Sequence, residues 1–160
     1  MLANRLYVIT RESNVIQVFD VHDSYRRLTD VKVSGMRWPR DIAACSLSNR
    51  LYIVDAANKC VFRVDDPTSG GPVTKWSGYR RVPHAVSVRA DRVLVTPNVF
   101  FHRTLRLCDC NGELLLGVEL PDYMEPRHAV ETSRSTFLVC HTGRGNASHD
   151  QVSGGYLRFH

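Results

Sequence analysis

The 160-residue sequence has little lysine, no long apolar run and no helical periodicity beyond two turns. Only Lys32, Lys59 and Lys75 occur, so arginine supplies most of the positive charge behind the net +5. The longest apolar stretches, such as Leu114 to Val118, are strand-sized. They fall far short of the roughly 18 residues that span a bilayer. We therefore expect a protein built from short strands, without a membrane span.

Motifs of several common enzyme classes are also missing. The sequence contains no G-x-S-x-G nucleophile motif, no P-loop, and no G-x-G-x-x-G that follows a strand. The adjacent carboxylates Asp65 and Asp66 fall in a predicted turn, where such side chains cap backbone groups. These absences favour a binding protein over an enzyme and give no reason to expect a resident cofactor.

Two further observations bear on the compartment. The N-terminal residues lead straight into a strand-like run without the apolar core of a signal peptide. The five cysteines are odd in number and include no C-x-x-C pair: they are Cys45, Cys60, Cys108, Cys110 and Cys140. Reduced thiols are typical of a reducing compartment. We therefore predict a cytoplasmic protein.

A repeat of about 43 residues is the main signal in the sequence. Strand-like segments that begin with a polar residue and continue with β-formers recur at regular intervals. They start at Arg5, Arg50, Arg92 and Thr136. A second marker, a proline followed by a short strand of small and branched residues, recurs at Pro39, Pro83 and Pro126. Two independent markers with one period make a chance similarity improbable.

Each repeat contains about four strand-length segments separated by turn residues. In the third repeat, Asn111-Gly112 lies between two apolar runs and predicts a hairpin. Four short antiparallel strands per repeat are typical of a propeller blade. The predicted fold class is therefore all-β, a partial β-propeller of about three and a half blades that could also close as four. We predict one propeller domain, or a propeller fragment, with blades at approximately 5–37, 38–81, 82–124 and 125–160.

The second repeat resembles NHL-type repeats and their YWTD-type relatives. The resemblance is carried by the segment from Pro39 to Val64, above all by Leu51-Tyr52-Ile53-Val54-Asp55 and by Asn58. The resemblance implies that the aspartate braces the turn after the second strand. Thr10 replaces it in the first repeat, Thr96 is its expected counterpart in the third, and Cys140 or His141 in the fourth.

The resemblance also implies a range of functions, because relatives of this kind are mostly interaction platforms. We therefore predict a scaffold for protein–protein interaction. One alternative is an RNA-binding NHL-like domain with a basic face. The other is a metal-dependent lyase or hydrolase at the channel mouth, which the peptide-amidating lyase branch of the family suggests.

About three and a half blades form an arc, and an arc leaves sheet edges exposed. A six-bladed ring would need about 6 × 43 residues at this period. The propeller could be completed by a longer parent chain, by closure as a small four-bladed ring, or by a second copy in a homodimer.

Two groups of candidate ligand-binding residues follow from the repeat. Asp41, His84 and His128 lie just after the recurring prolines, at positions that we take as equivalent and that would converge at the channel mouth. Carboxylate and imidazole ligands suit a divalent metal such as zinc.

The second group is basic and aromatic. It consists of Trp38, Arg40, Arg81 and Arg127 beside the same prolines. Stacking aromatics and arginines suit single-stranded RNA or an acidic peptide. The competing interpretation of Trp38 is packing between blades.

Overall fold

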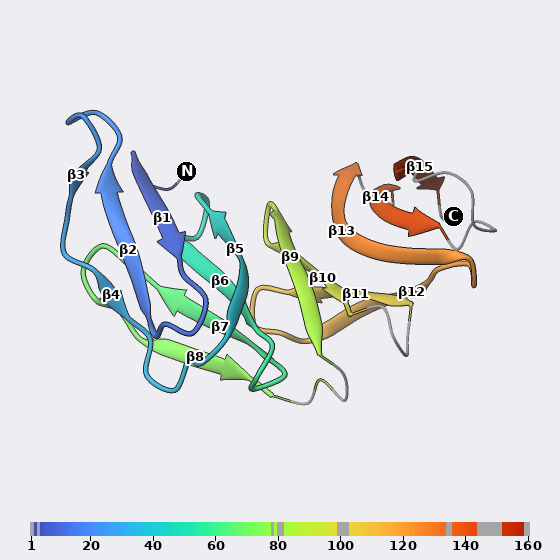
Figure 1. Ribbon diagram of the computed structural model, residues 1–160, viewed down its shortest axis with the longest axis horizontal. Helices are drawn as coiled ribbons and strands as arrows, with labels where there is room; N and C mark the ends of the chain where they lie inside the picture. Colours follow the sequence, from blue (N-terminus) through green and yellow to red (C-terminus); the bar gives the residue numbers. More distant parts are fainter. Residues whose placement is uncertain are drawn as a thin grey trace. The chain divides into compact units, whose positions relative to one another are not determined.

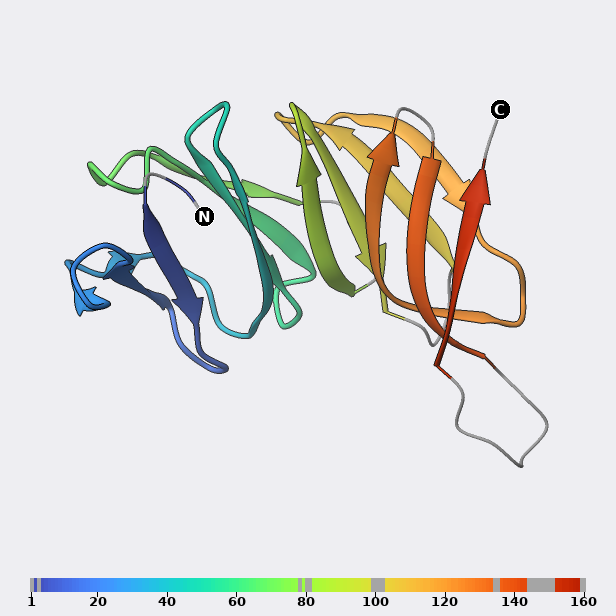
Figure 2. The same cartoon turned by 90° about the horizontal axis from the view of Figure 1, so that it is seen from above.

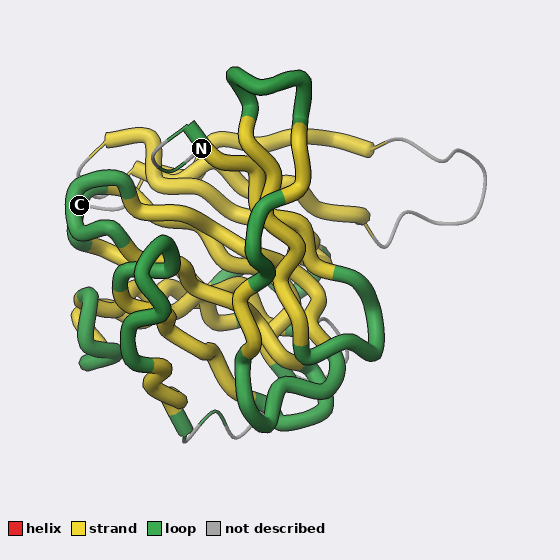
Figure 3. The backbone as a smooth tube through the Cα atoms, turned by 90° about the vertical axis from the view of Figure 1, so that its left-hand side faces the viewer, coloured by secondary structure: helices red, strands yellow, loops and turns green. Residues whose placement is uncertain are grey.

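The structure is a computed structural model of the chain. It describes Leu2, residues 4–77, Tyr79, and residues 82–98, 103–133, 136–143 and 152–158. Its described elements are all β-strands (Figure 3). The described residues include no helix that is long and apolar enough to cross a membrane. The chain divides into two compact units, Met1–Arg80 and Arg81–His160, and each contains two sheets.

The first unit contains two antiparallel sheets (Figure 1). Its first sheet comprises β1 (Arg5–Ile9), β2 (Val15–Asp20), β3 (Arg26–Arg27) and β4 (Val31–Lys32). Its second sheet runs in sequence order through β5 (Pro39–Cys45), β6 (Arg50–Asp55), β7 (Cys60–Asp65) and β8 (Val73–Trp76). Each strand of the second sheet pairs with the next along the chain, which is the predicted blade.

The second unit repeats this arrangement (Figure 2). Its first sheet comprises β9 (Pro83–Arg89), β10 (Arg92–Pro97), β11 (Thr104–Asp109) and β12 (Leu114–Glu119). Its second sheet comprises β13 (Met124–Ser133), β14 (Thr136–Gly143) and β15 (Val152–Arg158). The predicted strand order is therefore confirmed. The first sheet of the first unit departs from the expected blade, because both β3 and β4 pair with β2 where a single outer strand is expected.

Within each unit, the two sheets share a hydrophobic core. In the first unit, fully buried Ile16 of β2 belongs to the same cluster as Leu51 and Ile53 of β6. In the second unit, Leu105 of β11 belongs to one cluster with Phe137 and Val139 of β14. Alternate residues of these strands face the core, as the period-two pattern of the sequence requires. Burial of large apolar side chains between sheets is the main source of stability for such blades.

The five cysteines carry thiols and form no disulfide bonds. Cys60 begins β7 opposite Asp55 and is fully buried. Burial and, to a smaller extent, the nearby charge of Asp55 together raise the pKa of the Cys60 thiol to about 11. Cys140, by contrast, has an exposed side chain.

Cysteine reactivity should follow this difference in the folded protein. At about pH 8 only about one Cys60 thiol in a thousand would be ionised, and the thiolate is the reactive form. We expect iodoacetamide to label Cys140 rapidly and Cys60 only after unfolding in urea, with mass spectrometry identifying the modified peptides. Equal labelling rates for the two cysteines in the native protein would contradict the burial of Cys60.

Candidate functional site: the Trp38 cluster

Three side chains of the first unit form a cluster of one aromatic ring and two cations. The guanidinium carbon of Arg11 lies 4.5 Å from the centroid of the Trp38 ring, and that of Arg40 lies 5.4 Å from it. Both arginines are exposed, whereas Trp38 is half-buried. Cations within about 6 Å of an indole face are attracted by its negative quadrupole. We call Arg11, Trp38 and Arg40 the Trp38 cluster.

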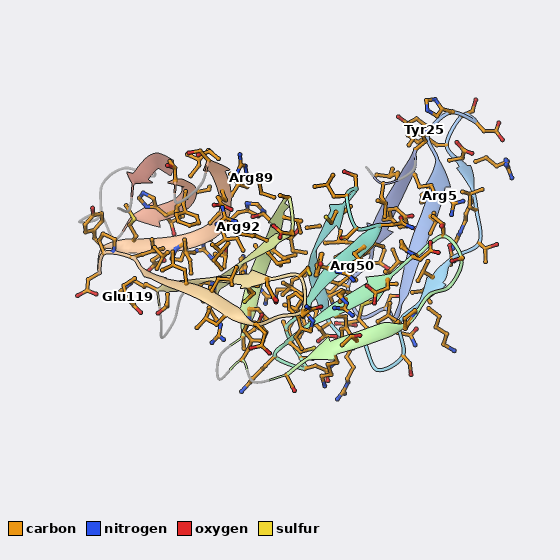
Figure 4. The ribbon with its side chains drawn as sticks, turned by 180° about the vertical axis from the view of Figure 1, so that it is seen from behind. Arg5, Tyr25, Arg50, Arg89, Arg92 and Glu119 are labelled. Carbon is orange, nitrogen blue, oxygen red and sulfur yellow. The ribbon has the colours of Figure 1, made fainter. Side chains whose placement is uncertain are left out.

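The three residues come from segments that meet at one end of the sheets. Arg11 lies in the turn between β1 and β2, Trp38 ends the linker from β4 to β5, and Arg40 is the second residue of β5. Figure 4 labels Arg5, the first residue of β1. The turn that carries Arg11 follows this strand.

Asp55 fixes the backbone that carries Trp38. One carboxylate oxygen, Oδ2, accepts hydrogen bonds from the backbone N–H of Arg37 at 2.6 Å and of Trp38 at 3.2 Å. The other, Oδ1, accepts the N–H of Asn58 at 2.9 Å. The Trp38 carbonyl in turn accepts the N–H of Ala56 at 2.9 Å. The Trp38 peptide is therefore held at both its N–H and its carbonyl.

Asn58 extends this clamp to the start of the linker. Its side-chain amide donates to Asp55 Oδ2 at 3.1 Å and to the carbonyl of Gly35 at 2.8 Å. The linker from Gly35 to Trp38 is thus bonded to the turn that follows β6. The turn-bracing role that the NHL resemblance implies for Asp55 matches these bonds, and they reach across to the linker as well.

The ionisation of Asp55 follows from the same contacts. Asp55 is fully buried, and burial alone would raise its pKa. The backbone N–H groups of Arg37, Asn58 and Trp38, together with the Asn58 side chain, outweigh burial and hold the pKa of Asp55 below its ordinary value. A carboxylate that accepts several backbone hydrogen bonds is stabilised in its charged form.

The clamp occurs in one blade only among the described strands. The residue that corresponds to Asp55 in another repeat is the one that pairs with the proline marker or, in the first repeat, the one that directly follows β1. Thr10 holds this place after β1, Pro97 pairs with Pro83, and His141 pairs with Pro126, as Asp55 pairs with Pro39. The register therefore corrects the predicted counterpart in the third repeat from Thr96 to Pro97. Thr10, Pro97 and His141 carry no carboxylate. Among the described residues, the linker that ends at Trp38 is therefore the only one clamped in this way.

A β-bulge recurs after each proline marker. The register skips Arg40 between Pro39 and Asp41, His84 between Pro83 and Ala85, and Arg127 between Pro126 and His128. A bulge redirects the side chain of the extra residue and increases the local twist of its strand. Arg40 and Arg127 are exposed at these positions, and His84 is half-buried.

This register corrects the assumption behind the predicted metal set. His84 is the bulge residue of its blade and corresponds to Arg40 and Arg127. The residue that corresponds to Asp41 and His128 is Ala85. Asp41 belongs to the first unit and both histidines to the second. The residues that the structure describes contain no group of three or more potential metal ligands. Metal binding by Asp41, His84 and His128 stays a prediction.

The remaining candidate residues have separate outcomes. Trp38 and Arg40 are in contact through the indole ring, and their role in ligand binding stays a prediction. Arg127 lies on β13 in the second unit. Arg81 falls outside the described residues. Sequence reasoning missed Arg11, because only the folded turn brings it to a tryptophan 27 positions later in the chain.

Comparisons with known proteins support the fold alone. No family model matches the sequence, and no curated protein matches it. Solved structures do match. Hydrazine synthase from Kuenenia stuttgartiensis has a TM-score of 0.73 and 16% identity over 97% of this chain and 43% of that one. U3-55K has a TM-score of 0.71 and 12% identity over 98% of this chain and 49% of that one.

A third match is a structure titled as a nidogen/laminin complex, with a TM-score of 0.59 and 15% identity over 72% of this chain and 42% of that one. The chain therefore spans less than half the length of each of these three structures. The neighbours are β-propellers, and together with the four antiparallel sheets they confirm the predicted fold class. The NHL subfamily is not confirmed by any of them.

Proposed function

We propose that this chain is a non-enzymatic propeller scaffold that binds an acidic segment of a protein partner at the Trp38 cluster. The observation that carries the proposal is the clamped backbone of Trp38, which holds an indole ring beneath two exposed guanidinium groups. Preorganised side chains lose less entropy on binding. Tryptophan and arginine are also the residues most enriched among interface hot spots.

The charge of the cluster determines the kind of partner. Arginine forks bind carboxylates through two parallel hydrogen bonds, and the sequence as a whole has a net charge of +5. A segment rich in glutamate or aspartate would match this charge. One of the structural neighbours is itself in a complex with a protein, which agrees with a protein partner.

RNA is the second candidate partner, in keeping with the NHL resemblance. The combination of arginine and tryptophan also suits a single strand, whose bases stack on aromatic rings. In the Trp38 cluster, however, the two guanidinium groups already lie over the ring. A base would have to displace one of them before it could stack. This arrangement favours carboxylate groups over nucleobases.

Binding of a labelled oligoglutamate peptide tests the proposal. By fluorescence anisotropy, Trp38→Ala should weaken binding about tenfold, and Arg11→Ala or Arg40→Ala about threefold each, as expected for contacts of a partly exposed cation. Arg26→Ala is the matched control, because Arg26 is an exposed arginine of the same unit that is paired with Asp23. Its affinity for the peptide should stay at the native value.

Oligouridine of matched length separates the two partners. Tighter binding of the RNA than of the peptide, with affinity that falls steeply as salt rises, would replace the protein partner by RNA. An equal loss in Arg26→Ala and Arg11→Ala would show a diffuse basic surface and overturn the assignment to the cluster.

A metal-dependent reaction at Asp41, His84 and His128 gains less support, since Ala85 interrupts the repeated position. Stoichiometric zinc in the purified protein, lost on His128→Ala, would revive it.

The thiols of all five cysteines agree with the proposed cytoplasmic location. Completion of the propeller by a longer parent chain, by a homodimer or by closure as four blades is a separate proposal, which the mass in solution tests.

A further inference from the structure

The outer strand of the first sheet in the second unit carries an exposed apolar edge. β12 ends the sheet order, and β11 is its only pairing partner among the described strands. Leu114, Leu115 and Leu116 are 52%, 54% and 39% exposed. Contiguous exposed leucines on an edge strand are unusual, because natural proteins protect such edges with lysine or proline. β12 contains neither.

A bulge explains why neighbouring leucines are exposed together. The register pairs Leu107 with Leu116 and Cys108 with Leu114, so that Leu115 is the extra residue. From Leu116 to Glu119, β12 pairs regularly with β11. Among the described strands, none pairs with the other edge of β12, so the backbone groups on this edge from Leu116 to Glu119 have no strand partner there. Leu115 directly precedes this regular stretch.

Leu115 also lines a cavity of about 460 Å³. The other lining residues come from the β9–β10 turn and its flanks and from the end of β11: Arg89, Ala90, Asp91, Arg92 and Asp109. Arg92 is held by an ion pair with the buried side chain of Glu131. Figure 4 labels Arg89 and Arg92 on this hairpin and Glu119 on β12. When a peptide adds to a sheet edge, a cavity beside the edge receives one of its alternate side chains.

The charges at the two ends of β12 determine which strand can pair with it. Glu113 precedes the strand and Glu119 ends it, and both are exposed. In an antiparallel pair of two copies centred on Leu116, Glu113 of one copy would lie opposite Glu119 of the other at both ends. Like charges placed directly opposite each other destabilise a sheet. Self-pairing is therefore disfavoured, and a strand with basic residues at both ends is favoured.

We propose that β12 binds an extended segment of a protein partner by strand addition. The segment has alternating apolar residues and a lysine or arginine at each end. Its backbone pairs with the free edge from Leu116 to Glu119, and one apolar side chain enters the cavity beside Leu115. Its basic ends meet Glu113 and Glu119. This surface is separate from the Trp38 cluster and has the opposite charge preference, so it does not depend on the function proposed above.

The test uses three labelled peptides and fluorescence anisotropy. The probe Lys-Val-Thr-Val-Thr-Val-Lys should bind about fivefold more tightly than Glu-Val-Thr-Val-Thr-Val-Glu, as expected for two exposed ion pairs. The double variant Glu113→Lys/Glu119→Lys should reverse this order. A probe with proline in place of the central valine should lose binding, since proline removes a main-chain donor.

Leucine variants supply the matched control. Leu115→Asp should weaken binding of the lysine-ended probe at least tenfold, because it places a charge beside the cavity. Leu47→Asp should leave it unchanged, since Leu47 is 80% exposed in a turn of the other unit. Equal affinities of the lysine- and glutamate-ended probes for the native protein would overturn the proposal. A concentration-dependent dimer that Leu115→Asp abolishes would also overturn it, in favour of a second copy on this edge.

Discussion

Asp55→Ala should lower the free energy of unfolding of the first unit by about 4 kcal/mol, because it leaves several buried hydrogen-bond donors without a partner. The backbone N–H groups of Arg37, Trp38 and Asn58 all donate to this carboxylate. Both tryptophans, Trp38 and Trp76, lie in the first unit. Urea unfolding followed by tryptophan fluorescence therefore measures the loss in this unit.

Two variants control this experiment. Asp55→Asn retains one acceptor oxygen and should lose about half as much stability. Asp23→Ala removes an exposed carboxylate of the same unit, which pairs with Arg26 at the surface, and should change the free energy of unfolding by less than about 0.5 kcal/mol. A similar small loss for Asp55→Ala would show that the clamp contributes nothing to the folded state.

The pH dependence of the same transition provides a second measure of the clamp. The pKa of Asp55 lies below its ordinary value in the folded protein. Ionised Asp55 therefore stabilises the folded state above the unfolded pKa of about 3.9, and this contribution disappears as the pH falls through the lower folded pKa. In the Asp55→Asn variant, the free energy of unfolding should accordingly fall less steeply as the pH is lowered. Asp30 and Asp66, whose pKa values are also lowered, should supply the remaining slope.

Phe137→Ala should be the most damaging single truncation in the second unit. Phe137 is fully buried on β14, in the cluster that joins its sheet to β10 and β11. Removal of a fully buried phenylalanine costs about 3–5 kcal/mol, because it leaves a cavity as well as losing the transfer free energy. For a chain of this size we expect the thermal midpoint, followed by far-UV circular dichroism, to fall by about 10 °C.

Tyr123→Ala is the matched control for Phe137→Ala. Tyr123 is an aromatic residue of the same unit that is 59% exposed. Its truncation should shift the midpoint by no more than about 2 °C. If both variants unfold at the same temperature, then Phe137 does not lie in a shared core and the two sheets are not packed as described.

The sequence predicts the blades well because two independent markers carry the same period. Pro39 and Pro83 begin β5 and β9, and Pro126 is the third residue of β13. Each of these three strands pairs with the next strand along the chain. The predicted starts at Arg5, Arg50, Arg92 and Thr136 are the first residues of β1, β6, β10 and β14. The first sheet is the exception. Its short β3 and β4 lack the apolar alternation that reveals a strand.

The candidate site could be predicted only in part. Trp38 and Arg40 stand beside a proline marker, so the repeat itself singles them out. Arg11 carries no such signal, since its contact with Trp38 depends on how the turn after β1 folds. Chemistry alone groups His84 with Asp41 and His128. The bulge places His84 one residue out of step with them, and along a strand one residue separates opposite faces.

The account depends most on the link between Asp55 and the Trp38 cluster. A double-mutant cycle with Asp55→Asn and Trp38→Ala measures it, with the affinity for labelled oligoglutamate as the readout and folding confirmed by circular dichroism. If Asp55 acts by positioning Trp38, Asp55→Asn should weaken binding several-fold in the native background and have no further effect when Trp38 is alanine. Equal losses in the two backgrounds would contradict the account, because Asp55 and Trp38 would then act independently.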